Sequence, residues 1–267
     1  MLLAHLFDLP CLIVVLSAIV ISFIACGQNR HHFFRLAAIL CLPVGAMGTE
    51  IGWLKMLSDM TNPDAFGPAS SVASFTIMYA FLFFPLLLSM GSRFANTPLK
   101  PNESARMRHI RVGGSLSLLG VLLLTAMVWK GSILYFIQIE SILCIGLFVA
   151  MPTFLHSPIK SEETLFLSRC VVARNYSVVA TISGLLIGTA GLLSGIDDPS
   201  TIGPNIALIL LTSLYSGFII VGSTLAYQVY AQKEIPHALV CIMGYMSAVI
   251  IGMLLNNAII IRAFIAF

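Results

Sequence analysis

The chain has 267 residues, of which 58% are hydrophobic and only 9% are charged, with a formal net charge of +3 and a mean hydropathy of +0.99. A soluble domain usually carries about 25% Asp, Glu, Lys and Arg, so these values exclude a soluble globular protein. The composition indicates an integral membrane protein. Because no long polar stretch occurs, we expect neither a catalytic domain outside the membrane nor a nucleic-acid partner.

Eight apolar stretches are each long enough to cross a bilayer as a helix, which needs about 20 residues. In chain order they cover residues 6–26, 36–57, 69–91, 110–129, 132–155, 176–195, 204–228 and 238–264. We therefore predict an all-α, polytopic membrane protein with about eight transmembrane helices. The first stretch is predicted to be a retained span, because residues 1–10 contain Asp8 and no Lys or Arg, unlike the start of a signal peptide.

The basic residues predict the orientation of the chain. Eleven of the fourteen Lys and Arg follow spans one, three, five and seven, namely Arg30, Arg35, Arg93, Lys100, Arg106, Arg108, Arg111, Lys160, Arg169, Arg174 and Lys233. The opposite side holds only Lys55, Lys130 and Arg262. Since loops rich in Lys and Arg stay in the cytoplasm, both termini are predicted to lie outside.

The chain contains an internal repeat at a constant offset, which carries Gly48 onto Gly184. Residues 48–79 align without gaps with residues 184–215, and ten of these 32 positions are identical. Most of the identical residues are Gly, Pro, Ser, Thr or Tyr, which chance alignment of apolar segments supplies less readily. We predict two parallel four-helix repeats, residues 1–131 and 132–267, related by a pseudo-two-fold axis along the membrane normal.

Each copy contains a hairpin of two spans, with small residues on its first helix and helix breakers in its outer turn. Small residues one turn apart let a neighbouring helix approach closely, and Pro is tolerated in the first turn of a helix. We assign packing and turn roles to Gly48, Gly52, Pro63 and Pro68 in the first copy and to Gly184, Gly188, Pro199 and Pro204 in the second. Thr76 and Thr212 lie in the return helices, where a hydroxyl either bonds its own helix or contacts an ion.

The second hairpin, with the turn Asp197-Asp198-Pro199-Ser200-Thr201-Ile202-Gly203-Pro204, resembles the last transmembrane hairpin of the MotA/TolQ/ExbB proton channel family, especially its flagellar stator (MotA/PomA) branch. The family pattern GxxGTxxG stands complete in the first copy, at Gly45–Gly52. The hairpin is thus apparently duplicated, over about residues 43–93 and 179–232.

The resemblance implies a protein of the bacterial inner membrane that forms homo-oligomeric rings of channel subunits. These rings surround a partner whose single spanning helix carries an ion-accepting Asp, and they conduct protons or sodium ions. The resemblance also implies that the polar residues of the two hairpins line the channel, namely Thr49, Thr76, Thr212 and Ser213.

The chain departs from that family in two respects. It has eight predicted spans where the stators have four, and its longest inner loops, near residues 92–109 and 156–175, are too short for the cytoplasmic domain that transmits torque. Direct rotation of a flagellar rotor is therefore not expected, and a divergent channel or scaffold subunit is the prediction.

Two acidic residues, Glu50 and Glu140, fall inside predicted spans, each roughly 10 to 12 Å below the outer surface. A carboxyl in the membrane costs several kcal/mol unless it is protonated, paired or hydrated, so each is a candidate for the ion pathway. Their equal depth permits one shared site. Alternatively, each is a neutral acid that holds a neighbouring helix through a hydrogen bond.

Three functions remain open at this point. The first is an oligomeric proton or sodium pathway with a single-span partner. The second is a secondary transporter whose parallel repeats enclose a midplane site with Glu50 and Glu140 as coupling acids, and the third is a noncatalytic membrane scaffold subunit. No hydrolase triad, phosphate-binding loop or metal cluster occurs, so no enzymatic activity, cofactor or metal is expected.

Overall fold

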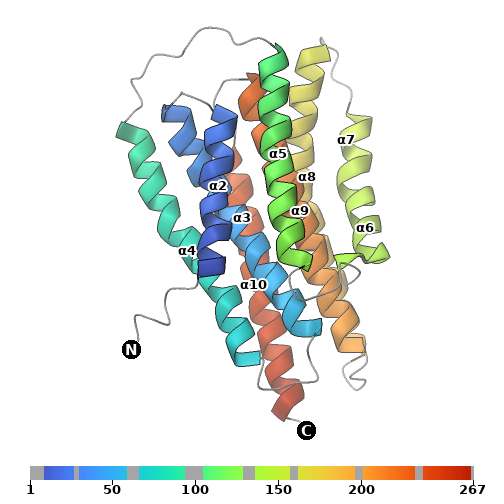
Figure 1. Cartoon of the computed structure of the whole chain (residues 1–267). Coiled ribbons are helices and arrows are strands. Elements are labelled where there is room, and N and C mark those ends of the chain that lie inside the picture. The colour runs from blue at the N-terminus through green and yellow to red at the C-terminus, as the bar shows by residue number, and fades with distance from the viewer. Residues whose placement is uncertain are drawn as a thin grey trace.

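The computed structural model describes residues 9–26, 30–58, 66–93, 105–128, 136–156, 162–195, 201–231 and 237–265. Within these ranges the regular elements are all helices (Figure 1). They are α2 (Leu9–Cys26), α3 (Arg30–Ser58), α4 (Phe66–Arg93), α5 (Ala105–Val128), α6 (Ile139–Ile145), a π-helical turn (Gly146–Ala150), α7 (Met151–Leu155), α8 (Glu162–Ser194), α9 (Ile202–Ala231) and α10 (Ala238–Ile265).

The predicted fold class is confirmed: the described chain is all-α, and several of its helices can cross a membrane. Among the described residues, six helices are long and apolar enough to do so, namely α2, α3, α4, α8, α9 and α10. The helix α5 and the run from α6 to α7 occupy the places of the two remaining predicted spans. A total of eight crossings therefore stays a prediction.

The predicted span 132–155 is broken in the structure by the π-helical turn that precedes Pro152. Proline lacks a backbone N–H, and its ring collides with the carbonyl one turn earlier, which favours a local opening of the helix, although α3 and α4 continue as α-helices through Pro43 and Pro85. The wider π-turn is that opening, and the Met151 backbone N–H accordingly donates to the Gly146 carbonyl.

The start of α8 differs from the sequence prediction, which placed Arg169 and Arg174 in an inner loop. The helix begins at Glu162 and has 33 residues, or about 50 Å at 1.5 Å per residue. This length exceeds the roughly 30 Å hydrocarbon core, so the helix extends beyond the apolar stretch that marked the predicted span. Arg174 is buried in the helical bundle, where the Cys241 thiol of α10 donates to its backbone carbonyl at 3.5 Å.

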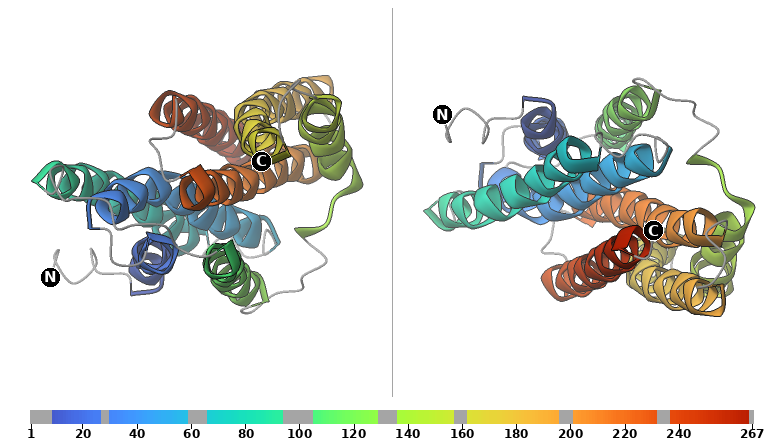
Figure 2. Two further views of the ribbon diagram at one scale, coloured as in Figure 1. Left: turned by 90° about the horizontal axis from the view of Figure 1, so that it is seen from above. Right: turned by 90° about the horizontal axis from the view of Figure 1, so that it is seen from below.

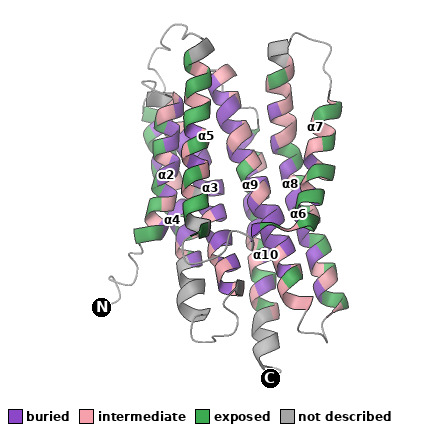
Figure 3. Cartoon of the chain, turned by 45° about the vertical axis from the view of Figure 1, so that its right-hand side comes forward, coloured by how far each residue is buried: buried purple, intermediate pink, exposed green. Residues whose placement is uncertain are grey.

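Two helices, α3 and α9, lie side by side along the middle of the bundle. Viewed from either end, α2 and α5 lie on one side of this pair and α8 and α10 on the other, while α4 flanks α3 (Figure 2). Figure 3 shows buried residues concentrated on these two central helices and exposed residues on the outer helices. Two clusters of buried apolar side chains therefore meet along α3 and α9.

The described helices alternate in direction. In Figure 1, α3, α5, α8 and α10 begin at the top of the bundle, and α2, α4, α6 and α9 begin at the bottom. The end at the top carries Arg35, Arg93, Arg108, Arg111 and Arg169, and we call it the basic end. Arg108 of α5 holds the last turn of α9 there by donating from Nη1 to the Tyr230 carbonyl at 3.4 Å.

The two hairpins, α3–α4 and α8–α9, close through equivalent contacts. A Cβ added at Gly48 would lie 2.7 Å from Cγ2 of Thr76, and a Cβ added at Gly184 would lie 2.7 Å from Cβ of Thr212. Both pairs are related by the same repeat offset. In each copy a threonine of the return helix therefore fills the space that a missing side chain leaves on the outgoing helix.

The hairpins meet through unlike helices. The outgoing helix of the first, α3, contacts the return helix of the second, α9. A two-fold axis between the copies would also bring α8 against α4, but these helices lie on opposite sides of the bundle (Figure 2). The hairpin junction thus differs from the two-fold arrangement that the sequence predicted.

Candidate ion-pathway site

Glu50 is fully buried between the central helices. It lies eight residues before the end of α3, or about 12 Å along the helix from that end, away from the basic end of the bundle. The residues of α3 on both sides of it are mostly buried, because α3 is enclosed by α2, α4, α9 and α10. Glu50 is therefore held within the bundle and not on its lipid-facing surface.

Two other helices supply polar groups to the Glu50 carboxyl. The Ser213 hydroxyl of α9 donates a hydrogen bond to Oε1. The hydroxyl of Tyr245, a fully buried residue of α10, lies beside the same carboxyl and donates to the Ser213 carbonyl at 3.3 Å. Gly217 makes space for this ring, since a Cβ there would lie 2.5 Å from the Tyr245 hydroxyl. The site thus joins α3, α9 and α10.

The second carboxyl oxygen, Oε2, has no hydrogen-bond partner among the described residues. A cavity of about 10 Å³ adjoins the carboxyl and is lined by Glu50, Ser213 and Thr181 together with apolar residues of α8, α9 and α10. This is about the space that one water molecule needs. The site therefore offers one oxygen anchored by Ser213 and one unpaired oxygen, in a residue that borders a small, mostly apolar cavity.

This arrangement suits reversible binding of a proton or a small cation. No ion pair of Glu50 occurs among the described residues, and an unpaired charge in such surroundings costs several kcal/mol. The carboxyl is therefore stable when it is neutral, and it can release its proton only when water or a cation moves beside it. Ser213 and Tyr245 hold it in place in either state.

The other threonines of the predicted pathway have different surroundings. Thr49, next to Glu50, donates to the Gly45 carbonyl of its own helix at 3.1 Å. Thr76 and Thr212 fill the hairpin contacts with Gly48 and Gly184. Of the six predicted pathway residues, the structure brings together Glu50 and Ser213.

The helix α9 carries three further buried hydroxyls. The hydroxyls of Thr212, Ser216 and Thr224 are buried and have no hydrogen-bond partner among the described residues. Buried polar atoms are usually paired, so each of these unpaired hydroxyls is unusual. Ser216 and Thr224 lie between Ser213 and the basic end of α9, whereas Thr212 precedes Ser213 and packs against Gly184 of α8.

Glu140 does not share the Glu50 site, which corrects the prediction of one site at a common depth. It is the second residue of α6, is exposed, and lies on a helix that contacts α8 and α9 but not α3. The helix α6 begins at Ile139, seven residues after the start of the predicted span from which the depth of Glu140 was inferred. A carboxylate in the first turn of a helix is stabilised by the helix dipole, which gives Glu140 a structural alternative to the predicted ion-pathway role.

The turn prolines are only partly covered by the structure. Pro63 and Pro199 lie outside the described residues. Pro68 and Pro204 are the third residues of α4 and α9, in a first turn where the missing backbone N–H breaks no helical hydrogen bond. Gly52 and Gly188 lie against the return helices, Gly52 against Ala73 and Gly188 against Ile209.

Sequence reasoning missed Tyr245 and Thr181. A tyrosine or threonine within an apolar helix is common, and nothing in their spacing connects them to Glu50. The available signal was Gly217, a small residue on α9 one turn beyond Ser213, which indicates that a large side chain approaches there. Which residue fills that space follows only from the packing of α10.

Comparison with known proteins gives one partial match. Over 79 residues the chain is 34% identical to the chemotaxis protein PomA of Vibrio alginolyticus, and the match covers 26% of this chain and 31% of PomA. The chain thus spans about a third of the length of this relative. No family model matches the chain. No solved structure matches it either.

Proposed function

We propose that this protein is a noncatalytic channel subunit of the stator type in the bacterial inner membrane, and that Glu50 binds and releases the transported proton or sodium ion. The observation that carries this proposal is a fully buried carboxyl with one oxygen anchored by Ser213 and the other without a hydrogen-bond partner among the described residues, in a residue that borders a small, mostly apolar cavity. The partial match to PomA supports the same class of protein. We also propose a membrane partner whose single spanning helix carries an acidic residue.

The proposed assembly is a ring of further copies of the chain. The junction of α3 with α9 is heterologous, because it joins unlike helices of the two hairpins, and such contacts continue from copy to copy until a ring closes. The equivalent helices α8 and α4 present exposed apolar side chains, among them Leu186 and Leu82. In a ring, α8 of one copy would pack on α4 of the next as α9 packs on α3 within one chain.

The channel role is tested by ion flux into vesicles that contain the purified protein and any membrane partner that copurifies with it. Glu50→Gln keeps the shape of the side chain and its hydrogen bond with Ser213, but it cannot exchange a proton. We expect the variant to fold and assemble normally and to abolish proton or sodium flux. Glu140→Gln is the matched control, since it makes the same chemical change at an exposed position.

Full flux through the Glu50→Gln variant would remove Glu50 from the pathway. A wild-type protein that conducts neither ion with any copurified partner would contradict the channel role, and the scaffold function would replace it. An equal loss in Glu50→Gln and Glu140→Gln would show that general loss of negative charge, and not the buried site, limits flux.

The ring is tested by disulfide trapping between neighbouring copies. The repeat offset maps the contact of Glu50 with Ser213 onto Leu186 and Ile77, which belong to different copies in the proposed ring. We expect the double variant Leu186→Cys/Ile77→Cys to yield a ladder of cross-linked oligomers in membranes. Each single variant, which retains the six native cysteines, is the control. A ladder that the single variants reproduce, or no ladder, would contradict this packing.

A further inference from the structure

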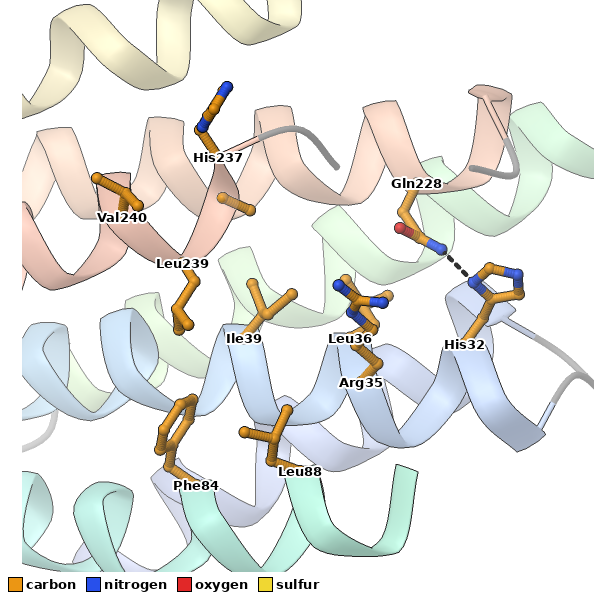
Figure 4. Close-up of a pocket in the computed structure, with 11 residues that line it drawn as sticks. His32, Arg35, Leu36, Ile39, Phe84, Leu88, Gln228, His237, Leu239 and Val240 are labelled. Carbon is orange, nitrogen blue, oxygen red and sulfur yellow. Dashed lines mark hydrogen bonds between the residues drawn. The ribbon is translucent and has the colours of Figure 1, made fainter. Parts of the chain in front are cut away.

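The side-chain amides of Gln228 and Asn256 are both buried in the bundle, but they differ in their hydrogen bonds. Gln228 of α9, at the basic end, donates from Nε2 to Nδ1 of His32 on α3 at 2.8 Å (Figure 4). This pair borders a cavity of about 290 Å³. Asn256 of α10 is fully buried, and neither its Oδ1 nor its Nδ2 has a hydrogen-bond partner among the described residues. One amide is therefore paired within the bundle and the other is not.

The unpaired amide of Asn256 is more unusual than the unpaired hydroxyls of α9. A hydroxyl on a helix can turn to the carbonyl one turn earlier, whereas an amide has two donor hydrogens and two acceptor positions to satisfy. Burial of such a group without any hydrogen bond is costly, and buried polar atoms are nearly always paired with protein or with bound water. Asn256 is therefore a candidate position for a bound polar molecule.

Asn256 lies on the same face of α10 as the residues that reach the Glu50 site. Tyr245 precedes Gly252 by seven residues and Gly252 precedes Asn256 by four, which is the spacing of one helix face. The Tyr245 hydroxyl lies beside the Glu50 carboxyl, and Gly252 lines the small cavity that Glu50 borders. Asn256 is thus one turn, or about 6 Å along the helix, beyond a residue of the cavity lining. Because α10 begins at the basic end, Asn256 lies toward the opposite end.

Gly252 places no side chain between Asn256 and the small cavity. The Cα–Cβ bonds of a helix tilt toward its N-terminus, so the Asn256 side chain is directed back toward Gly252. The neighbouring helices approach Gly252 closely, since an added Cβ would lie 3.3 Å from Cδ1 of Leu185 and 3.4 Å from Cγ2 of Ile209. Even a methyl group at Gly252 would therefore narrow the space between the amide and the cavity.

We propose that Asn256 binds a water molecule, and that this water joins a second one in the small cavity to connect Glu50 with the end of the bundle opposite the basic end. The ligand is water because the amide carries no charge and the neighbouring cavity, of about 10 Å³, admits no larger molecule. Bound water also supplies both the donors and the acceptors that an amide needs.

These waters give the Glu50 carboxyl a place to send its proton. Its O–H bond breaks toward the water, the electron pair remains on the carboxylate, and the proton passes to the next water; the reverse steps restore the neutral acid. Oε2 of Glu50 has no partner among the described residues, so it can take this role. The inference rests on the proposed function only in assigning this exchange to ion transport, because access of water to Glu50 is measurable without flux.

Infrared spectroscopy of the full chain in detergent tests this route. On transfer to heavy water, the C=O stretch of a neutral carboxyl shifts as a deuteron replaces its proton, and the Glu50 band is the one absent from the Glu50→Gln variant. We expect this band to shift rapidly in the wild type. Asn256→Leu nearly keeps the size of the side chain, but the water loses the hydrogen bonds of the amide, so the shift should be about tenfold slower or more.

Asn257→Leu is the matched control, because it makes the same change at a partly exposed residue that lies about 100° around α10 from Asn256. It should leave the exchange rate close to that of the wild type. If Asn256→Leu does not fold, Gly252→Ala decides the question, since its methyl group narrows the route while the amide remains, and it should slow the exchange. Its control is Gly244→Ala on the same helix, where the nearest atom would lie 3.5 Å from the added Cβ.

Three results would overturn the route. They are unchanged exchange in Asn256→Leu, equal slowing by Asn256→Leu and Asn257→Leu, and the absence of a Glu50 band, which would show an ionised carboxyl. Unchanged exchange together with a higher melting temperature of Asn256→Leu would mean that the amide is unpaired in the protein and binds no water.

Failure of the proposed function gives a different result. Vesicles would then conduct neither ion, although Asn256→Leu still slows the exchange at Glu50, and the water route would stand without a role in transport. Conversely, flux that Glu50→Gln abolishes, with exchange that Asn256→Leu does not change, would retain the proposed function and remove the route.

Discussion

The two hairpins share one internal contact but have opposite surroundings. In α3–α4 the outgoing helix is central, with 89% of its apolar span buried against 28% for the return helix. In α8–α9 the return helix is central, with 67% buried against 39% for the outgoing helix. The repeated Gly and Thr residues therefore determine how each hairpin closes, whereas the junction between hairpins determines which helix is buried.

The polar residues Glu50 and Ser213 lie at the junction of the two hairpins, and the repeat does not conserve them. Glu50 and Ser213 meet where α3 packs on α9. Their equivalents in the other copy, Leu186 and Ile77, are apolar and lie on outer helices, where Leu186 is 64% exposed. A carboxyl on that outer surface would face lipid at a cost of several kcal/mol. Of these two positions, only the one at the buried junction can hold an acid away from lipid.

The largest expected effect comes from making the α3–α9 junction as apolar as the equivalent positions of the repeat, Leu186 and Ile77. Glu50→Leu combined with Ser213→Ala removes both partners of the hydrogen bond, so neither partner of that bond is left unpaired. We expect near-normal thermal stability in detergent and complete loss of ion flux, because replacing both partners by apolar groups is nearly neutral.

The single variant Ser213→Ala is the control for this exchange. It leaves the Glu50 carboxyl without its donor, so we expect a loss of about 1 to 3 kcal/mol in stability. If the double variant is less stable than this single variant, the pair has a structural role that the present argument does not give it.

The second effect concerns the shared contact of the hairpins. Gly48→Ala and Gly184→Ala each place a Cβ within 2.7 Å of a threonine, and overpacking of this kind costs about 1 to 3 kcal/mol. The two copies should differ in rescue, because the Thr76 atom in the way is the methyl Cγ2, whereas at Thr212 Cβ itself is equally close.

We therefore expect Thr76→Ser to restore part of the stability of Gly48→Ala, with Val14 Cγ1 at 2.8 Å limiting the recovery. Thr212→Ser should not restore Gly184→Ala. Thermal unfolding of the four single and two double variants measures both couplings. Gly113→Ala is the control, since no atom lies within 4 Å of the added Cβ, and it should be neutral or slightly stabilising. Equal rescue in both copies would contradict the assigned contacts.

Much of the fold is predictable from the sequence because hydrocarbon imposes simple rules. Apolar segments of about 20 residues must form helices there. The predicted segments 36–57 and 204–228 accordingly correspond to α3 and α9, and three of their four ends agree with the ends of these helices to within about three residues. The repeat also identifies Gly48 and Gly184 as small residues at close helix contacts. Both inferences rest on local sequence.

The remaining features depend on packing between helices. Nothing in the sequence fixes which helices of the two hairpins meet, so Glu140 was paired with Glu50 by depth while Tyr245 was missed. Likewise, Arg174 was assigned to a loop because it is charged. In the structure α8 extends beyond the apolar stretch, and Arg174 is buried within the bundle. Charge and hydropathy locate a segment along the membrane normal, but they do not give its neighbours.

The smallest expected effect concerns the helices that precede the hairpins. The helix α2 is continuous over 18 residues, whereas its counterpart is interrupted by the π-helical turn before Pro152. The repeat offset aligns Pro152 with Leu16, so Pro152→Leu makes the second copy resemble the first. Proline within a regular helix costs about 3 kcal/mol, but here the π-turn already accommodates it, so we expect a gain of about 1 kcal/mol or less.

Thermal unfolding in detergent measures this gain, and hydrogen exchange at the new backbone N–H of residue 152 shows whether it enters a helical hydrogen bond. The exposed faces of α7 leave space for the leucine, since Met151, Phe154 and Leu155 are all exposed there. The π-turn also makes contacts of its own, because Val149 is buried and its carbonyl accepts the Thr153 hydroxyl at 2.6 Å. A loss of stability would mean that straightening the helix breaks these contacts, and the interruption would then be a packing feature of the second copy and not an accommodation of proline.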